Sequence, residues 1–203
     1  MLTLPRFVCA TRAQTVHPVL LRSYITWQTT EENYDCFIWE AAKATSAAPL
    51  FFEPTQLRAS KATFVDGALH LNNPISEVIN EAKSLWPGAD FKSIVSIGTG
   101  WIDPKGLELS QLKIHNVVKT CVDLAISSHK EAQKFARDDR GKELSQAGVY
   151  FRFDVDRGID TVALDQWQKL DDVDAFTEAY LTRSGSELER CAHSLCKEEA
   201  ARR

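Results

Sequence analysis

The stretch FVDGALHLNNP, from Phe64 to Pro74, constrains the fold of this chain more than any other part of the sequence. Its first residues continue a short apolar run that begins at Thr63 and is typical of a β-strand. The run ends on the carboxylate of Asp66, which Gly67 and Ala68 follow. Enzymes of the α/β class place catalytic groups at such strand ends, before a residue without backbone restriction. A lone Asp-Gly pair usually marks only a turn, so the surrounding sequence decides its meaning.

A helix is predicted directly after this stretch. Asn73 is a good N-cap and Pro74 suits the first helical position. Apolar residues then recur at helical spacing as far as Trp86, and Pro87-Gly88 ends the pattern.

The segment SIVSIGTG, Ser93–Gly100, follows with the pattern of a buried strand that ends in a glycine turn. A strand, a helix and a second strand with connections of this size predict a parallel pair with a right-handed crossover. We therefore expect a three-layer α/β/α fold with a mostly parallel sheet. Asp66 is expected in a loop at the C-terminal edge of that sheet, partly exposed and beside Gly98–Gly100.

The N-terminal part predicts two strands, Arg6–Ala10 and Val19–Ile25, separated by a polar turn. Asp35 is expected to cap a helix that ends at Pro49. The second half of this helix is almost entirely Ala, Ser and Thr. Such small side chains either let the helix lie close against a sheet or leave space for a bound chain.

The C-terminal half predicts a helix over about residues 112–135 and a strand over Val149–Val155. Two more helical faces follow, one over residues 173–181 and one over residues 188–195. The chain is therefore expected to close with a helical segment.

Charge and composition exclude several classes of function. The net charge is −4 with acids and bases mixed along all 203 residues, which gives no basic surface for nucleic acid or anionic membranes. No uncharged stretch approaches the ~18 residues of a membrane span, and Pro5 and Arg6 interrupt the first apolar run. The five scattered cysteines indicate free thiols in a reducing compartment. We expect a soluble cytoplasmic protein.

Two glycine-containing segments do not support a cofactor or calcium site. The turn Gly98-Thr99-Gly100 lacks the third glycine and the helix start of a nucleotide-binding loop. The segment DVDRGID places Gly158 at the fifth position of a calcium loop instead of the sixth, with Asp165 where the loop needs glutamate. We interpret it as an acidic turn and expect no cofactor.

Two histidines invite a functional interpretation that we reject. His193 lies between Cys191 and Cys196, but residues two apart on a helix point to nearly opposite sides and could not converge on zinc. His70 lies four residues after Asp66 with no nucleophile beside it, so we interpret it as a surface or turn residue. No metal site is expected.

Four motifs in order carry a specific resemblance. ATSAAP at residues 44–49 is followed by the FVDGA motif around Asp66, by NNP at residues 72–74 and by SIGTG at residues 96–100. This series resembles the catalytic domain of patatin-like phospholipases, especially the fungal type. FVCAT near the start and YFRFDVDRGID with LDQW near the end are also similar to that group. The resemblance implies that residues 1–155 are the C-terminal part of the acyl hydrolase domain, with residues 156–203 as a helical extension packed on it.

The resemblance implies a hydrolase of lipid metabolism that acts on phospholipid or lysophospholipid esters with a Ser-Asp dyad. The dyad aspartate of the family matches Asp66, in the DGA motif with Gly67 and Ala68. A peripheral membrane contact is compatible with such a substrate. The nucleophile of the family is the serine of a GxSxG elbow, and a glycine-rich loop forms its oxyanion hole.

This chain contains neither of those two parts. No serine stands in GxSxG, and Ser186, which follows a glycine, lacks the second glycine and a preceding strand. The nucleophile is therefore not in the chain. Two hypotheses remain open: the chain is part of an active acyl hydrolase, or it is a catalytically dead remnant of that fold that binds lipid or protein. Alone it is expected to be inactive. In the family fold the missing strands lie inside the sheet, so we also expect the chain alone to be insoluble, self-associated or molten, and an upstream segment to rescue it.

Overall fold

The computed structural model describes residues 4–25, 33–49, 51–100, 128–159, 162 and 166–196. The chain forms a mixed α/β structure that divides into two compact units, Met1–Gly88 and Ala89–Arg203. Within the described ranges, no helix combines the length and the apolar character that a membrane crossing requires.

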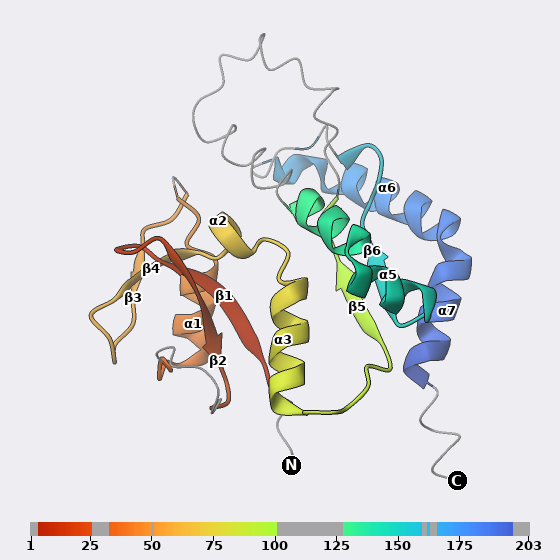
Figure 1. Ribbon diagram of the computed structural model, residues 1–203. Coiled ribbons are helices and arrows are strands. Elements are labelled where there is room, and N and C mark those ends of the chain that lie inside the picture. Colours follow the sequence, from red (N-terminus) through yellow and green to blue (C-terminus); the bar gives the residue numbers. More distant parts are fainter. Residues whose placement is uncertain are drawn as a thin grey trace. The chain divides into compact units, whose positions relative to one another are not determined.

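The first unit is built on a four-stranded sheet in the order β2-β1-β4-β3. Every neighbouring pair in it is antiparallel. The strands are β1 (Phe7–Arg12), β2 (His17–Arg22), β3 (Thr55–Gln56) and β4 (Thr63–Asp66). The strand that ends on Asp66 therefore has a neighbour on each side (Figure 1).

The two predicted N-terminal strands are present as the hairpin β1–β2. Their bounds are shifted, because Pro18, which was expected in the turn, lies inside β2 opposite Thr11. A proline removes a backbone donor, and it is tolerated here because β2 is an edge strand with one neighbour in the sheet. Val16 completes the turn with a left-handed φ of 52°.

The first helix, α1, spans Ile38–Thr45, and its N-cap is Phe37 instead of the predicted Asp35. The side chain of Phe37 cannot accept a hydrogen bond from the backbone N–H groups at the helix start. The carboxylate of Glu40 instead binds backbone N–H groups near this end of the helix. Glu40 accepts the N–H of Phe37 at 2.9 Å and the N–H of Arg58 at 2.9 Å. These backbone hydrogen bonds, with that of Phe37 first, lower the pKa of Glu40. Glu40, the third residue of the helix, thus supplies the acidic side chain at the helix start that Asp35 was expected to supply.

The small residues at the end of α1 pack directly on the sheet. Ala44 and Ala47 are fully buried, and α1 packs against β1 and β4 (Figure 1). Of the two interpretations left open by the sequence, close helix–sheet packing is thus confirmed. The buried residues that form this core are Ala10, Leu21, Ala44, Leu57, Ala62 and Phe64.

A one-turn helix, α2 (Ala68–Leu71), and a longer one, α3 (Ile75–Leu85), follow β4. The predicted helix is therefore confirmed, but its N-cap is Pro74 and Asn73 is buried just before it. The helix ends before Gly88, whose φ of 79° suits a glycine at the end of a helix.

A buried charged network joins α3 to the hairpin. The Arg22 guanidinium donates to both carboxylate oxygens of Glu81, at 2.7 and 2.9 Å. The Tyr24 hydroxyl donates to the same carboxylate at 2.7 Å. The side chains of Arg22 and Glu81 are only 4% and 9% exposed. Hydrogen bonds from Arg22 lower the pKa of Glu81, while burial raises the pKa of Tyr24.

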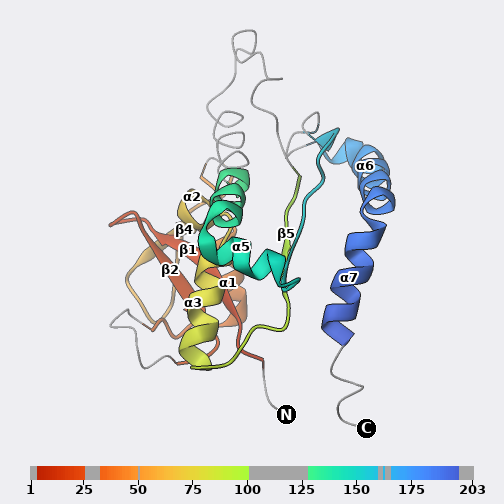
Figure 2. The same ribbon diagram turned by 45° about the vertical axis from the view of Figure 1, so that its right-hand side comes forward.

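The second unit contains the parallel strands β5 (Ile94–Ile97) and β6 (Tyr150–Phe153), which run side by side in Figure 2. Residues 128–137 are helical, and the part of the predicted helix before residue 128 lies outside the described residues. The other helical elements are α5 (Asp139–Gln146), η2 (Trp167–Lys169), α6 (Leu170–Arg183) and α7 (Gly185–Cys196).

The C-terminal helices pack on β6. Phe151 and Phe153 from the strand form a core with Cys191 of α7, and Tyr180 and Leu188 pack against it. The two predicted C-terminal helices are thus confirmed. The boundary of the acyl hydrolase domain between residues 1–155 and 156–203 stays a prediction.

The expectation of a mostly parallel sheet was only partly right. β5 and β6 are parallel, but the sheet that carries Asp66 is antiparallel throughout. The predicted parallel pairing of the strand at Asp66 with the strand at Ile94 does not occur, because β1 and β3 occupy both edges of β4. The proximity of Asp66 to Gly98–Gly100 joins residues of different units and stays a prediction.

The open edge of β5 leads to a prediction about self-association. In the described part of the chain β5 pairs only with β6, and Ile97 is 78% exposed. An exposed apolar strand edge pairs readily with another chain. We expect Ile97→Lys to reduce the self-association of the chain, measured by light scattering during size-exclusion chromatography. Leu195→Lys, at an exposed position of α7, is the control and should change little. A wild-type chain that elutes as a monodisperse monomer would contradict the prediction.

The Arg22–Glu81 pair leads to a prediction about stability and pH. Glu81→Ala removes the carboxylate that the buried Arg22 guanidinium binds, so the free energy of unfolding should fall by about 3–5 kcal/mol at pH 7. Because the pKa of folded Glu81 lies below its ordinary value, the contribution is full above that value and is lost as the pH falls through the folded pKa. The measurement is urea unfolding in the Ile97→Lys background at neutral and acidic pH.

Asn80→Ala, an exposed change on the same helix, serves as the control for the stability measurement and should be nearly neutral. A loss for Glu81→Ala no larger than this control, or one that does not shrink in acid, would show that the pair contributes little.

Candidate functional site

Asp66 lies at the C-terminal end of β4, half-buried and opposite Ala10 of β1. Its backbone N–H donates to the carbonyl oxygen of Ala47 at 3.0 Å. Its Oδ1 accepts the N–H of Ala68 at 2.7 Å, which ties the carboxylate to the first residue of α2. No hydrogen bond from the described part of the chain reaches the other oxygen, Oδ2. Among the described residues, the carboxylate is thus held by one of its two oxygens.

Gly67 is required by a close approach of two backbone segments. Its φ of −65° and ψ of −22° are ordinary helical values, so backbone freedom is not the reason for the glycine, contrary to the expectation from sequence. A Cβ at this position would overlap the carbonyl group and the Cβ of Cys9 in β1. Only glycine therefore lets the chain turn from β4 into α2 this close to β1.

The carbonyl oxygen of Cys9 also holds the end of α1. Thr45 donates its hydroxyl to that oxygen at 2.5 Å. Together with the bond between Asp66 and Ala47, this places two residues of the ATSAAP run against β1 and β4. The run and the DGA motif, recognised separately in the sequence, thus form one local structure.

The Cys9 thiol, on the strand opposite Asp66, is not a candidate for nucleophilic chemistry. Burial, followed by the charge of Glu77, raises the pKa of Cys9 to about 12, so its thiolate is scarce at neutral pH. Cys191 is buried, Cys36 is half-buried and Cys196 is exposed, and all four are free thiols. The expectation of free thiols is therefore confirmed for these, while Cys121 lies outside the described residues.

Two side chains near Asp66 are engaged elsewhere. The Ser46 hydroxyl donates to the carbonyl oxygen of Ala42 at 2.8 Å, the usual arrangement for a serine at a helix end. His70 is exposed on α2, and its Nδ1 lies 3.5 Å from the Thr11 hydroxyl. The interpretation of His70 as a surface residue is confirmed, and neither side chain forms a dyad with Asp66.

In the second unit, the Gly98–Gly100 turn is held by a charged pair that the sequence did not reveal. Asp154 accepts the N–H of Gly100 at 2.8 Å, and Arg152 donates to Asp154 and to the Ser96 hydroxyl at 2.7 and 2.8 Å. A Cβ at Gly98 would overlap the side chains of this pair. The segment interpreted as an acidic turn therefore fixes the glycine turn. The signal available was the alternation of Arg152 with the apolar residues of β6.

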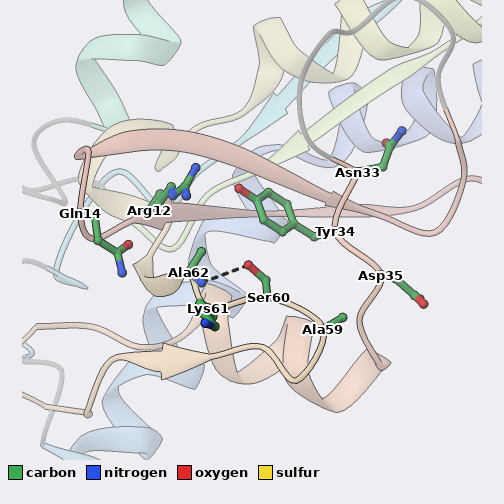
Figure 3. Close-up of a pocket in the computed structure, with 9 residues that line it drawn as sticks. All are labelled: Arg12, Gln14, Asn33, Tyr34, Asp35, Ala59, Ser60, Lys61 and Ala62. Atoms are coloured by element: carbon green, nitrogen blue, oxygen red, sulfur yellow. Dashed lines mark hydrogen bonds between the residues drawn. The ribbon is translucent and has the colours of Figure 1, made fainter.

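A polar cavity of about 460 Å³ lies at the other end of β4 (Figure 3). Ala62, which precedes β4, donates its N–H to the Ser60 hydroxyl at 3.0 Å in the cavity wall. With about 3.3 Å of rise per strand residue, Asp66 is roughly 13 Å farther along the chain, so the cavity does not contain it. The residues that line it are Arg12, Gln14, Asn33, Tyr34, Asp35, Ala59, Ser60, Lys61 and Ala62.

The zinc and calcium candidates gain no support from their surroundings. Cys191, His193 and Cys196 lie on α7, where the first is buried and the last is exposed. Asp154 and Asp156, from the acidic turn, bind arginines instead. Among the described residues, no group of three or more His, Cys, Asp or Glu side chains could hold a metal ion.

Comparison with known proteins finds similarity to patatin-like phospholipases. Residues 9–79 match the model of the patatin-like phospholipase family. Calcium-independent phospholipase A2-gamma of Rattus norvegicus is 29% identical over 93% of this chain, and that of Homo sapiens is 29% identical over 80%. Phospholipase A I of Arabidopsis thaliana is 38% identical over 31% of the chain.

The matched region has a defined extent. It contains β1 from Cys9 onward, α1, β4 and Asp66, which form the site described above. The chain spans 24% of the length of the rat relative, 20% of the human one and 5% of the Arabidopsis one. The resemblance to patatin-like phospholipases, first recognised from four motifs, is confirmed.

The close approach at Gly67 leads to a prediction. Gly67→Ala forces its new Cβ against the backbone of Cys9, so the free energy of unfolding should fall by about 1–3 kcal/mol. Gly185→Ala is the matched control, since a Cβ at the start of α7 meets no atom within 4 Å. Urea unfolding of both variants in the Ile97→Lys background measures the difference. Equal stability of the two variants would contradict the prediction, because it would mean that the backbone at Gly67 can move away from Cys9 without loss of free energy of unfolding.

Proposed function

We propose that this patatin-like chain is part of a lipid acyl hydrolase of the phospholipase or lysophospholipase type, with Asp66 as the base of a Ser-Asp dyad. The observation that carries the proposal is the position of Asp66 within the family match. It ends a central strand, it is fixed through Oδ1 and the Ala47 carbonyl, and it is half-exposed. A catalytic base needs this combination of fixed geometry and access.

In the proposed reaction, the Oδ2 atom of Asp66 accepts the proton of a serine hydroxyl as the serine oxygen attacks the ester carbonyl carbon of a lipid. The proton then passes to the leaving alcohol as the ester bond breaks and an acyl-serine remains. Water then attacks the acyl carbon while Asp66 takes its proton. The bond to the serine oxygen breaks, and the proton passes to that oxygen as the fatty acid leaves. The bond from Ala68 to Oδ1 keeps the carboxylate directed during both halves.

The serine and the oxyanion hole must come from residues outside the 203 present here, because the sequence contains no GxSxG and no glycine-rich loop. Backbone N–H donors of such a loop would stabilise the negative charge of the tetrahedral intermediate. We propose that an upstream segment supplies both. No step of this reaction needs a metal ion, in keeping with the names of the calcium-independent relatives.

The substrate proposed from these relatives is a phospholipid or lysophospholipid ester, met at a membrane surface by peripheral contact. A cytoplasmic location fits the free thiols of the chain.

The absence of the nucleophile favours a second candidate function. A chain with Asp66 but no serine elbow can be a catalytically inactive remnant that binds lipid or protein. The two candidates differ in what precedes Met1 in the gene. An in-frame GxSxG there supports the hydrolase, and its absence supports the remnant.

The first experiment tests the chain alone. The 203-residue chain should hydrolyse p-nitrophenyl esters no faster than its Asp66→Ala variant, because a base without a positioned nucleophile does little. Turnover that disappears in Asp66→Ala would reveal an overlooked nucleophile. Ser46→Ala would then be the first variant to examine, despite the bond from Ser46 to Ala42.

The second part of the test restores the upstream segment, where the gene encodes a GxSxG elbow. The longer protein should hydrolyse phospholipid, and Asp66→Asn should lower kcat by about 10²–10⁴-fold. Thermal unfolding of both forms controls for folding. Hydrolysis that is insensitive to Asp66→Asn in a folded protein would refute the role of Asp66 as the base.

A further inference from the structure

Three exposed apolar side chains lie on the two segments that hold Asp66. Phe51 and Phe52 follow the ATSAAP run and are 40% and 65% exposed. Leu69, on α2 three residues after Asp66, is 37% exposed. We call these three residues the apolar rim.

The rim is fixed to the site by backbone hydrogen bonds. Phe51 and Phe52 both donate their N–H groups to the carbonyl oxygen of Ala48, at 3.1 and 3.0 Å. The preceding residue, Ala47, accepts the N–H of Asp66. The segment that follows α1 and the helix α2 lie at the same end of the first unit (Figure 1). The rim therefore lies on the two segments that hydrogen-bond to Asp66.

We propose that the apolar rim contacts the acyl chains of the lipid at the surface of an uncharged bilayer, and so brings the ester to Asp66. This inference rests on the proposed function. Lipids bring long apolar chains next to the ester, and exposed phenylalanine and leucine are the side chains that insert at the boundary between head groups and acyl chains.

Charges around the rim favour an uncharged surface over an anionic one. The exposed charges nearest in sequence to the two phenylalanines are those of Glu53 and Arg58, which are opposite in sign. A surface that attracts anionic lipid carries several basic residues instead. Contact should therefore depend on apolar burial and respond little to salt.

The first unit also provides a matched control at the other end of α1. Ile38, the first residue of that helix, is 88% exposed. Eight residues at 1.5 Å each separate the two ends of α1 by about 12 Å, so Ile38 is remote from Asp66. If any exposed apolar side chain sufficed for membrane contact, Ile38 would serve as well as Phe52.

The test measures flotation of the 203-residue chain with phosphatidylcholine vesicles through a density gradient. Vesicle-bound protein rises in such a gradient while self-associated protein sinks. We expect the wild type to float, Phe52→Ser to bind about tenfold more weakly, and Phe51→Ser with Phe52→Ser to bind more weakly still. Ile38→Ser should float as the wild type does, and circular dichroism checks that all variants fold alike.

Three results would overturn the proposal. The wild type fails to float with phosphatidylcholine vesicles, Phe52→Ser floats as well as the wild type, or binding needs anionic lipid and disappears in about 0.5 M salt, where exposed charges are screened. The second result would indicate that another part of the protein covers the rim. Vesicle binding needs no nucleophile, so loss of binding and loss of Asp66-dependent hydrolysis are separate outcomes.

Discussion

The carbonyl group of Cys9 is the point on which the arrangement around Asp66 depends. Thr45 reaches it from α1 with a hydroxyl, and Gly67 passes so close to it that no side chain fits between. Because β1 lies between β2 and β4, this one peptide group fixes the helix, the central strands and the turn after Asp66 together. A shift of either neighbour would break a hydrogen bond or open a gap in a close-packed region.

A glycine without room for a side chain also occurs in the second unit, where side chains instead of backbone lie against it. Gly98 also lacks room for a side chain, but there the space is filled by Arg152 and Asp154 instead of backbone. Asp154 in turn accepts the N–H of Gly100. In both motifs the glycine is required by what lies against it. A glycine that the sequence suggests is needed for backbone freedom can thus be needed for lack of space. The atoms that would overlap its Cβ identify the neighbouring segment.

Local features of the fold were predictable, and pairings between distant segments were not. The helix after Asp66 and the strand at Ile94 follow from periodicity and helix-end signals that reside in a few adjacent residues. The direction of strand pairing depends on partners far along the chain, and an apolar run such as that of β4 suits either direction. Arg22 and Glu81 illustrate the same limit, because nothing near either residue indicates the other. Asp66 was singled out because it ends an apolar run before a glycine, and the four motifs in order made it the candidate base.

The antiparallel sheet has a consequence for the order of folding. β1 and β2 are adjacent in the chain and need only a short turn, so their hairpin can form within microseconds. The register of Asp66 is set opposite Ala10, and it requires the whole intervening chain, including α1, to close as a loop. Such long-range closure is the slow, entropically costly step of folding. The carboxylate is therefore expected to reach its position after the hairpin that it pairs with has formed.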